Sequence, residues 1–207
     1  MELDLPDIDF VEQIKSSTSS CIFRTRWRNR DCILKVRWES QAYIRLKAHG
    51  LFHKGSIPDF YSLVTGINPN KWLPYLNEFF DENLLPNAIL IEYIPNLQQI
   101  GLYTFCKERV NKLHQILADI HQAGVYHADP YARNMMVQEG SDRVLWLDFN
   151  RAQTFSYDSI TARQRQWLEE KDELMDYFVD VLAADYEEGK IHRTWECYYE
   201  KFKSLLD

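Results

Sequence analysis

The stretches HADPYARN (residues 127–134) and LWLDFNRA (residues 145–152) are the parts of this sequence that decide the fold. The first places Asp129 and Asn134 five positions apart, and the second is a short apolar run that leads into Asp148. Thirteen residues lie between Asn134 and Asp148. Either motif alone is weak evidence. Their order and spacing together are specific, and they indicate which elements to expect in the segments on both sides.

This order and spacing resemble the catalytic centre of the protein-kinase fold. The resemblance implies that Asp129 faces the group that accepts a phosphoryl group, and that Asn134 and Asp148 hold metal-bound phosphates. It also implies an upstream strand with a lysine that pairs with the phosphates, followed by a helix with a glutamate. The resemblance extends over residues 10–152, about two thirds of the chain.

The upstream segments match this expectation. In CILKV, residues 32–36, alternation with a period of two points Ile33 and Lys35 to one face of a strand. A helical pattern follows in residues 39–50, where Glu39 shares a face with apolar side chains four and seven positions later. We therefore predict that Lys35 binds the substrate and that Glu39 turns toward it.

The segments between these parts also follow the expected order. Residues 88–95 are predicted to form a strand and the hinge between two lobes. A helix with a buried apolar stripe is predicted next, with Gly124 as its C-terminal stop. The stripe consists of Val110, Leu113, Ile116, Leu117 and Ile120. His127 begins the catalytic loop and is predicted to contact the substrate.

Three departures separate this chain from an ordinary protein kinase. No glycine precedes Gly50, so the glycine-rich turn that covers the phosphates is missing. Asn150 stands where the Asp-Phe-Gly motif has its glycine. Between Asp148 and a helix that starts near residues 161–167 there is no room for the activation segment that seats a peptide. An ordinary protein kinase is therefore excluded.

Composition indicates one catalytic module. The chain has 207 residues, 45% of them hydrophobic and 14% aromatic, which suffices for a core without suggesting two independent domains. The predicted fold class is α+β, a minimal two-lobed kinase-like fold with a small antiparallel sheet and a mainly helical second lobe. The predicted N-terminal lobe is 1–93, with an insertion at 66–87, and the C-terminal lobe is 94–207.

Three further segments have predicted structures. Residues 70–88 are rich in aromatic side chains and are expected to form one or two packed helices. Residues 161–187 form a long amphipathic helix, whose apolar stripe includes Trp167, and residues 191–206 form one more.

Location and redox state follow from simple counts. The four cysteines show no Cys-x-x-Cys spacing, which favours reduced thiols in the cytoplasm. The acidic start has no signal-peptide pattern, and no apolar run approaches the length of a membrane span. We expect neither a membrane nor a DNA partner. The oligomeric state cannot be predicted.

An arginine stripe, defined as Arg24, Arg26 and Arg28, precedes the lysine strand. The same alternation points these side chains to one face and Phe23 and Thr25 to the other. Three guanidinium groups in a row form a local cationic surface on a protein of net charge −7. Two interpretations stay open: a solvated face of the sheet, or a surface that contacts an RNA backbone.

At the paired motifs the chain resembles a narrower group, the fungal arginine-containing cyclodipeptide synthases. Asp129 and Asn134 match the D-x-x-x-x-N motif of that family, and Asp148 and Arg151 match its D-F-x-R motif. The resemblance implies condensation of an arginyl group from arginyl-tRNA with a second aminoacyl group. Such an enzyme needs no cofactor, neither Mg²⁺ nor ATP, and the arginine stripe is then expected to grip the tRNA.

The predicted catalytic residues suit this chemistry. Asp129, Asn134 and Asp148 form an anionic pocket for a guanidinium group, and Asp129 serves as general base. Arg151 orients Asp148 or binds an RNA phosphate.

Two alternatives come from other functional classes. An ATP- and Mg²⁺-dependent phosphotransferase acting on a small molecule uses Lys35 on the phosphates, Asn134 and Asp148 on the metal, and Asp129 as base. A catalytically silent pseudokinase serves as a binding module, which explains the departures but not the presence of the complete polar set.

Overall fold

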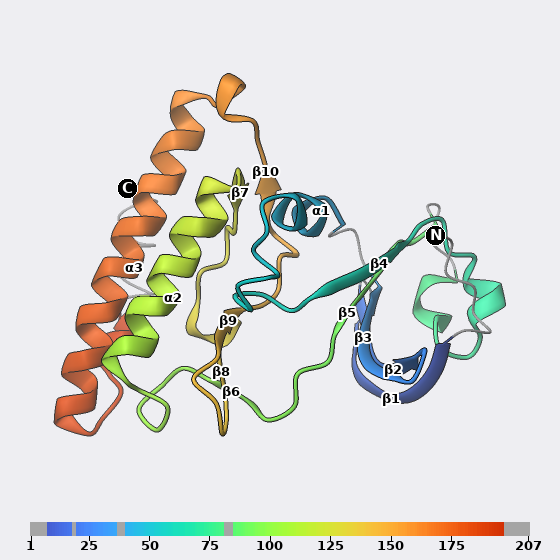
Figure 1. Cartoon of the computed structure of the whole chain (residues 1–207), viewed down its shortest axis with the longest axis horizontal. Coiled ribbons are helices and arrows are strands. Elements are labelled where there is room, and N and C mark those ends of the chain that lie inside the picture. Colours follow the sequence, from blue (N-terminus) through green and yellow to red (C-terminus); the bar gives the residue numbers. More distant parts are fainter. Residues whose placement is uncertain (1–7, 18–19, 37–39, 81–84, 197–207) are drawn as a thin grey trace.

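The computed structural model describes residues 8–17, 20–36, 40–80 and 85–196. Figure 1 shows a sheet at one end of the molecule and the two longest helices at the other, with a short helix and several short strands between them. The predicted α+β, two-lobed arrangement is confirmed. The lobe boundaries at 93 and 94 and the insertion limits of 66–87 stay predictions.

The N-terminal lobe is built on a five-stranded antiparallel sheet in the order β1-β2-β3-β5-β4. Arg28 and Asn29 form the tight turn between β2 and β3, with φ of 49° and 61°. Two positive φ angles are typical of the turn that matches the twist of a hairpin. The strands are β1 (Ile8–Ser17), β2 (Ser20–Trp27), β3 (Arg30–Val36), β4 (Phe60–Val64) and β5 (Ala88–Glu92).

The alternation predicted for β3 is confirmed. The side chains of Ile33 and Lys35 face the C-terminal lobe. The residues that alternate with them, Cys32, Leu34 and Val36, face a separate apolar cluster. That cluster is closed by the insertion, whose described residues form the short 3-10 helices η2 (Pro69–Trp72) and η3 (Asn77–Phe79) in place of longer ones. The insertion therefore stabilises the outer face of the sheet.

The C-terminal lobe rests on two long helices, α2 (Lys107–Gln122) and α3 (Ala162–Glu188), which pack side by side. All five side chains of the predicted α2 stripe are buried. Thr161 caps α3 with a reciprocal capping box. Trp167, predicted within the apolar stripe of α3, is only half-buried. Most of the predicted helix at 191–206 lies outside the described residues.

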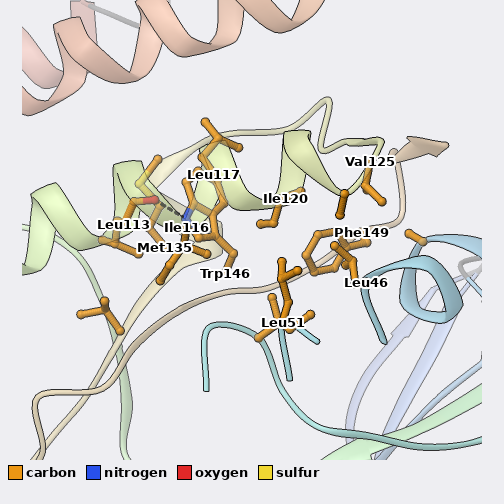
Figure 2. Packing of buried hydrophobic residues seen from close by; sticks show 14 of the residues in the cluster. Leu46, Leu51, Leu113, Ile116, Leu117, Ile120, Val125, Met135, Trp146 and Phe149 are labelled. Atoms are coloured by element: carbon orange, nitrogen blue, oxygen red, sulfur yellow. Dashed lines mark hydrogen bonds between the residues drawn. The ribbon is translucent and has the colours of Figure 1, made fainter. Parts of the chain in front are cut away.

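Helix α1 (Ser40–Ala48) confirms the predicted helix after β3 and joins the main core through Tyr43 and Leu46. Figure 2 shows Leu46 near Phe149, and the apolar face of α2 packed against Trp146. The indole nitrogen of Trp146 donates to the Leu113 carbonyl over 2.8 Å. This core therefore connects elements of both lobes.

Short elements surround the predicted catalytic loop. Strands β6, β8 and β9 form a three-stranded antiparallel sheet, and β7 pairs with β10. Their bounds are β6 (Leu97–Gln99), β7 (Val125–Tyr126), β8 (Met135–Gln138), β9 (Val144–Trp146) and β10 (Gln153–Thr154), and the 3-10 helices are η4 (Ala132–Asn134) and η5 (Tyr157–Ser159). The connection from Asp148 to α3 is short, as predicted. No helix in the described part of the chain is long and apolar enough to cross a membrane.

Candidate active site

A cavity of about 360 Å³ lies between the N-terminal sheet and the C-terminal lobe. Its walls are mostly apolar, Lys35 and Asp148 form an ion pair among its polar groups, and Glu92 lines it as well. This volume and this distribution are typical of small-molecule and cofactor sites. The apolar lining includes Ile14, Ile22, Ile33, Ile91, Ile94, Leu97 and Leu147, and the polar lining includes Lys35, Arg133, Asn134 and Asp148. We call it the cleft cavity.

Lys35 and Asp148 meet in this cavity, although 113 positions separate them in the sequence. The Lys35 ammonium donates to Asp148 Oδ1 over 2.9 Å. The lysine side chain is only 7% exposed, whereas the aspartate side chain is 37% exposed. The pair therefore holds a cation and a carboxylate in the cleft cavity, with the carboxylate accessible to a ligand.

The backbone at Asp148 is held in an uncommon conformation. Its φ is 60°, a left-handed angle that costs a non-glycine residue roughly 1–2 kcal/mol. The following residue, Phe149, is fully buried and packs edge-on against Tyr43, with ring centroids 5.3 Å apart. Anchoring of Phe149 therefore fixes the direction of the Asp148 side chain. At Asn150, which stands in the position of the motif's glycine, φ is not positive.

Asp129 is held by two neighbours within the catalytic loop. The Asn134 amide donates to the Asp129 carbonyl over 2.9 Å and to its carboxylate over 3.0 Å. Arg133 donates to the other carboxylate oxygen over 2.5 Å. Ala128, just before the aspartate, has a φ of 60°. Such strained positions cluster at functional sites, because the surrounding contacts must impose them.

His127 was predicted to contact the substrate, but it does not line the cleft cavity. The ring is fully buried, packs against Trp146 and Phe149, and its Nε2 lies 3.0 Å from the Leu147 carbonyl. Burial lowers the pKa of His127 to about 4, although the Leu147 carbonyl and nearby carboxylates act in the opposite direction. The ring is therefore neutral at pH 7 and its Nε2–H donates to that carbonyl. Its role is to fix the catalytic loop to the strand that precedes Asp148.

The cleft cavity has the donors that Mg²⁺ prefers. Both side-chain hydrogen bonds of Asn134 come from Nδ2, so the side-chain oxygen Oδ1 is directed away from Asp129, and Asp148 lines the same cavity. Among the described residues, no three His, Cys, Asp or Glu side chains cluster as a metal cage. Mg²⁺ in phosphate sites takes only one or two carboxylates and completes its shell with water and phosphate oxygens. Asn134 and Asp148 therefore fit that ion.

A second ion pair at the rim of the cleft escaped sequence analysis. Arg143 donates to both carboxylate oxygens of Glu92, over 2.7 and 2.8 Å, and to the Gly55 carbonyl over 3.0 Å. Partial burial raises the pKa of Glu92, but the Arg143 hydrogen bonds and the Asp59 amide outweigh it and lower the pKa below its ordinary value. Glu92 and Arg143 are 51 positions apart, and no local pattern links them.

The arginine stripe is partly neutralised within the sheet. Arg24 pairs with Asp31 at 3.1 Å and lies over the Tyr93 ring, and Arg26 pairs with Asp31 at 3.7 Å. Arg28 lies in the β2–β3 turn and not on the strand face. The three guanidinium groups therefore do not form one continuous cationic surface, which favours the interpretation of a solvated sheet face.

Glu39 lies outside the described residues, so its position near Lys35 stays a prediction. Arg151 is exposed, and no hydrogen bond or ion pair connects it to Asp148 in the described part of the chain, so it does not orient that carboxylate. Arg133, which the sequence analysis missed, holds Asp129 instead. Its position four residues after Asp129 in the same loop was an available signal.

Comparison with known proteins places these features in context. Residues 89–176 match the family described as lipopolysaccharide kinase (Kdo/WaaP) family. This segment is less than half of the chain, but it contains Asp129, Asn134 and Asp148. No curated protein matches the sequence.

The structure of the Cydia pomonella granulovirus kinase PK-1 resembles this one with a TM-score of 0.54. The match covers 88% of this chain and 71% of that chain, at 12% sequence identity. At that identity the likeness shows the fold, which is protein-kinase-like. It is one of 1747 matching chains among solved structures, and so widespread a fold does not by itself choose an activity.

These comparisons overturn the prediction of an arginine-containing cyclodipeptide synthase that uses arginyl-tRNA and no cofactor. The matched family is described as a kinase family, which points to a phosphotransferase, and the similar structure shows the kinase-like fold. Neither supports a cyclodipeptide synthase or a fungal origin. The error arose because two short motifs with the same carboxylates suit a guanidinium group or a metal-bound phosphate equally well.

Proposed function

We propose that this protein is a phosphotransferase that uses ATP and Mg²⁺ and acts on a small molecule. The observation that carries the proposal is the Lys35–Asp148 ion pair in a mostly apolar cleft cavity. An apolar cavity suits a nucleobase, and a lysine beside a carboxylate suits its phosphates. The kinase family match over residues 89–176, which include Asp129, Asn134 and Asp148, supports the same activity.

Each side chain then has a role in transfer. Lys35 binds the phosphates. Its hydrogen bond to Asp148 also keeps this metal-binding carboxylate in place. Asn134 and Asp148 hold Mg²⁺, which supplies positive charge against the charge that develops on the phosphates. A hydroxyl oxygen of the acceptor bonds to the γ-phosphorus while the bond from that phosphorus to the bridging oxygen breaks and ADP leaves. The hydroxyl proton passes to the Asp129 carboxylate.

A small acceptor fits better than a peptide. In protein kinases the segment after the Asp-Phe motif is long and seats the peptide. Here only residues 149–161 separate Asp148 from helix α3, and they include β10 and η5. The prediction of a missing activation segment therefore supports a substrate that enters the C-terminal lobe as a compact molecule.

The missing glycines do not remove the cover of the cavity. Ile14 of β1 and Ile22 of β2 line the cleft cavity, so the hairpin lies over it. Residues 18–19, which connect these strands in the sequence, lie outside the described part of the chain.

Consumption of ATP with water as a slow acceptor tests the proposal without knowledge of the natural substrate. We expect ³¹P NMR at high protein concentration to show formation of ADP that requires Mg²⁺ and stops on addition of a chelator. Asp148→Asn should lower the rate by about a thousandfold, because it removes a charge that holds the metal.

The matched control is Asp142→Asn, which changes an exposed carboxylate in the β8–β9 turn and should leave the rate unchanged. Formation of ADP at equal rates in the wild type and in Asp148→Asn would assign the activity to a contaminant. Absence of both ADP formation and Mg-ATP binding in the wild type would reject the proposed function.

A further inference from the structure

A second cavity, of about 560 Å³, lies beside the catalytic loop. Arg133 lines both this cavity and the cleft cavity, so the two meet at the residue that holds Asp129. The second cavity is the larger of the two and lies among the catalytic loop, the segment after β6 and the C-terminal part of α3. We call it the loop cavity. No step described above uses it.

Its walls combine apolar surface with two aromatic rings. Ile100, Leu182 and Ile191 provide aliphatic contacts from three separate segments of the chain. Tyr131 and Trp195 line it as well, and Trp195 is 66% exposed. A large exposed tryptophan at the edge of a cavity is costly in water, and contact with an apolar or flat ligand reduces that cost.

Two guanidinium groups line the loop cavity, and they differ in their contacts. Arg133 donates to Asp129 and lies over the Tyr131 ring, 4.4 Å from its centroid. Arg151 makes no hydrogen bond or ion pair with any other described residue. In a protein of net charge −7, whose other cavity-lining arginine is already paired, Arg151 is therefore the group available for an anion.

We infer that the loop cavity binds the acceptor, and that this acceptor is a small molecule with an apolar or flat body and an anionic group, a carboxylate or a phosphate. Arg151 binds the anion. The body lies against Tyr131 and Trp195, and a hydroxyl at the other end reaches Asp129 past Arg133. This inference rests on the proposed phosphotransfer, in which that hydroxyl oxygen receives the γ-phosphoryl group, ADP leaves, and its proton passes to Asp129.

The cavity volume supports a small molecule over a peptide. Cavities that hold small ligands typically measure roughly 300–1,000 Å³, and they bury most of the ligand. The loop cavity lies within this range, and Leu182 of α3 forms part of its wall. The single charge of Arg151 selects ligands by their charge, and the apolar walls limit their size.

Three matched probes test the inference in the full-length protein with Mg²⁺ and a non-hydrolysable ATP analogue present. They are 4-(hydroxymethyl)benzoate, 4-(hydroxymethyl)phenyl phosphate and the neutral 4-(hydroxymethyl)benzamide. Saturation-transfer NMR titration measures the affinity of each probe. We expect at least one anionic probe to bind about tenfold tighter than the amide, since a charge-assisted pair is worth about 1.5 kcal/mol or more. The preferred anion then identifies a carboxylate or a phosphate ligand.

Arg151→Gln should abolish the preference for an anion, and its melting temperature checks that it folds. The control, Arg165→Gln, changes an exposed arginine on α3 that lines neither cavity and should retain the preference. Equal affinity for all three probes, no binding of any probe to the wild type, or an unchanged preference in Arg151→Gln would each overturn the inference.

A parallel titration with Mg-ATP separates this inference from the proposed function. If the wild type binds Mg-ATP but shows no anion preference, the acceptor site is wrong and phosphotransfer stands. If the wild type does not bind Mg-ATP, the proposed function fails, and with it the assignment of the loop cavity to an acceptor.

Discussion

Two ion pairs connect the N-terminal sheet to the same strand of the C-terminal lobe, and they are built differently. Arg143 immediately precedes β9, and Asp148 follows it two residues after its end. Arg143 pairs with Glu92 at the end of β5, and Asp148 pairs with Lys35 on the neighbouring strand β3. One short strand thus carries a contact at each end to the other lobe.

The difference lies in the geometry and the exposure of each pair. Glu92 and Arg143 form two parallel bonds, and the Gly55 carbonyl and the Asp59 amide add one more to each partner. Glu92 lines the cleft cavity, but both of its carboxylate oxygens accept from Arg143. Lys35 donates over 2.9 Å to Asp148, whose side chain is 37% exposed and lines the same cavity. The first pair therefore stabilises the fold, whereas the second is placed for a ligand.

The largest expected effect is on the rate of phosphotransfer, and it comes from Asp129, which lies in the catalytic loop near the Lys35–Asp148 pair. Asp129→Asn should lower the rate of ADP formation by about a thousandfold, because the amide cannot accept the acceptor's proton. The affinity for Mg-ATP should change by less than about threefold, since Asp129 does not line the cleft cavity. Rate measurement at saturating ATP, together with nucleotide titration, checks both. A parallel loss of affinity would place Asp129 among the nucleotide-binding groups.

The next effect concerns the Glu92–Arg143 pair and should appear in stability. Arg143→Met leaves a partly buried carboxylate with fewer partners and should lower the free energy of unfolding by about 2–3 kcal/mol. Urea denaturation measures this change. The double variant with Glu92→Met should recover part of the loss, because no unpaired charge remains. Full wild-type stability of Arg143→Met would remove the structural role assigned to this pair.

A smaller effect follows from His127, which joins the catalytic loop to the strand before Asp148. Its pKa is about 4 in the folded protein and 6.5 ordinarily, so the unfolded chain binds the proton more readily. Stability is therefore complete above pH 6.5 and is lost as the pH falls toward 4. We expect a loss of about 2 kcal/mol between pH 7 and pH 5.

Urea denaturation of the wild type and His127→Gln at both pH values measures this effect. The variant should be less stable at pH 7 and should show a flatter pH dependence, because it has no ring to protonate. The pKa values of Glu92 and Asp185 are also lowered, but those carboxyl groups lose their contribution only at more acidic pH. Equal pH dependence in the two proteins would assign the effect to other groups.

Local sequence patterns predicted the parts of the fold that depend on one element. The period-two alternation in β3 placed Lys35 correctly, and the stripe of α2 was correct at every position because helical spacing alone decides which side chains face a core. The paired motifs indicated Asp129, Asn134 and Asp148, which lie after β7, at the end of η4 and after β9.

Features that depend on contacts between distant segments were not predictable in this way. The Glu92–Arg143 pair requires the register of two lobes, and the left-handed angle at Asp148 is imposed by the packing of Phe149. The choice between a guanidinium group and metal-bound phosphates also failed at this level. Carboxylates and an amide suit both, and the surrounding cavity and the family match were needed to decide.

The central claim is that the cleft cavity with Lys35 and Asp148 is a nucleotide site, and calorimetric titration with Mg²⁺ and a non-hydrolysable ATP analogue tests it most directly. The wild type should bind one equivalent. Lys35→Met should weaken binding by about tenfold or more through loss of a charge-assisted bond. Arg143→Met, measured where it is folded, should bind within about threefold of the wild type. Equal binding by Lys35→Met and the wild type, or no binding by the wild type, would contradict the account.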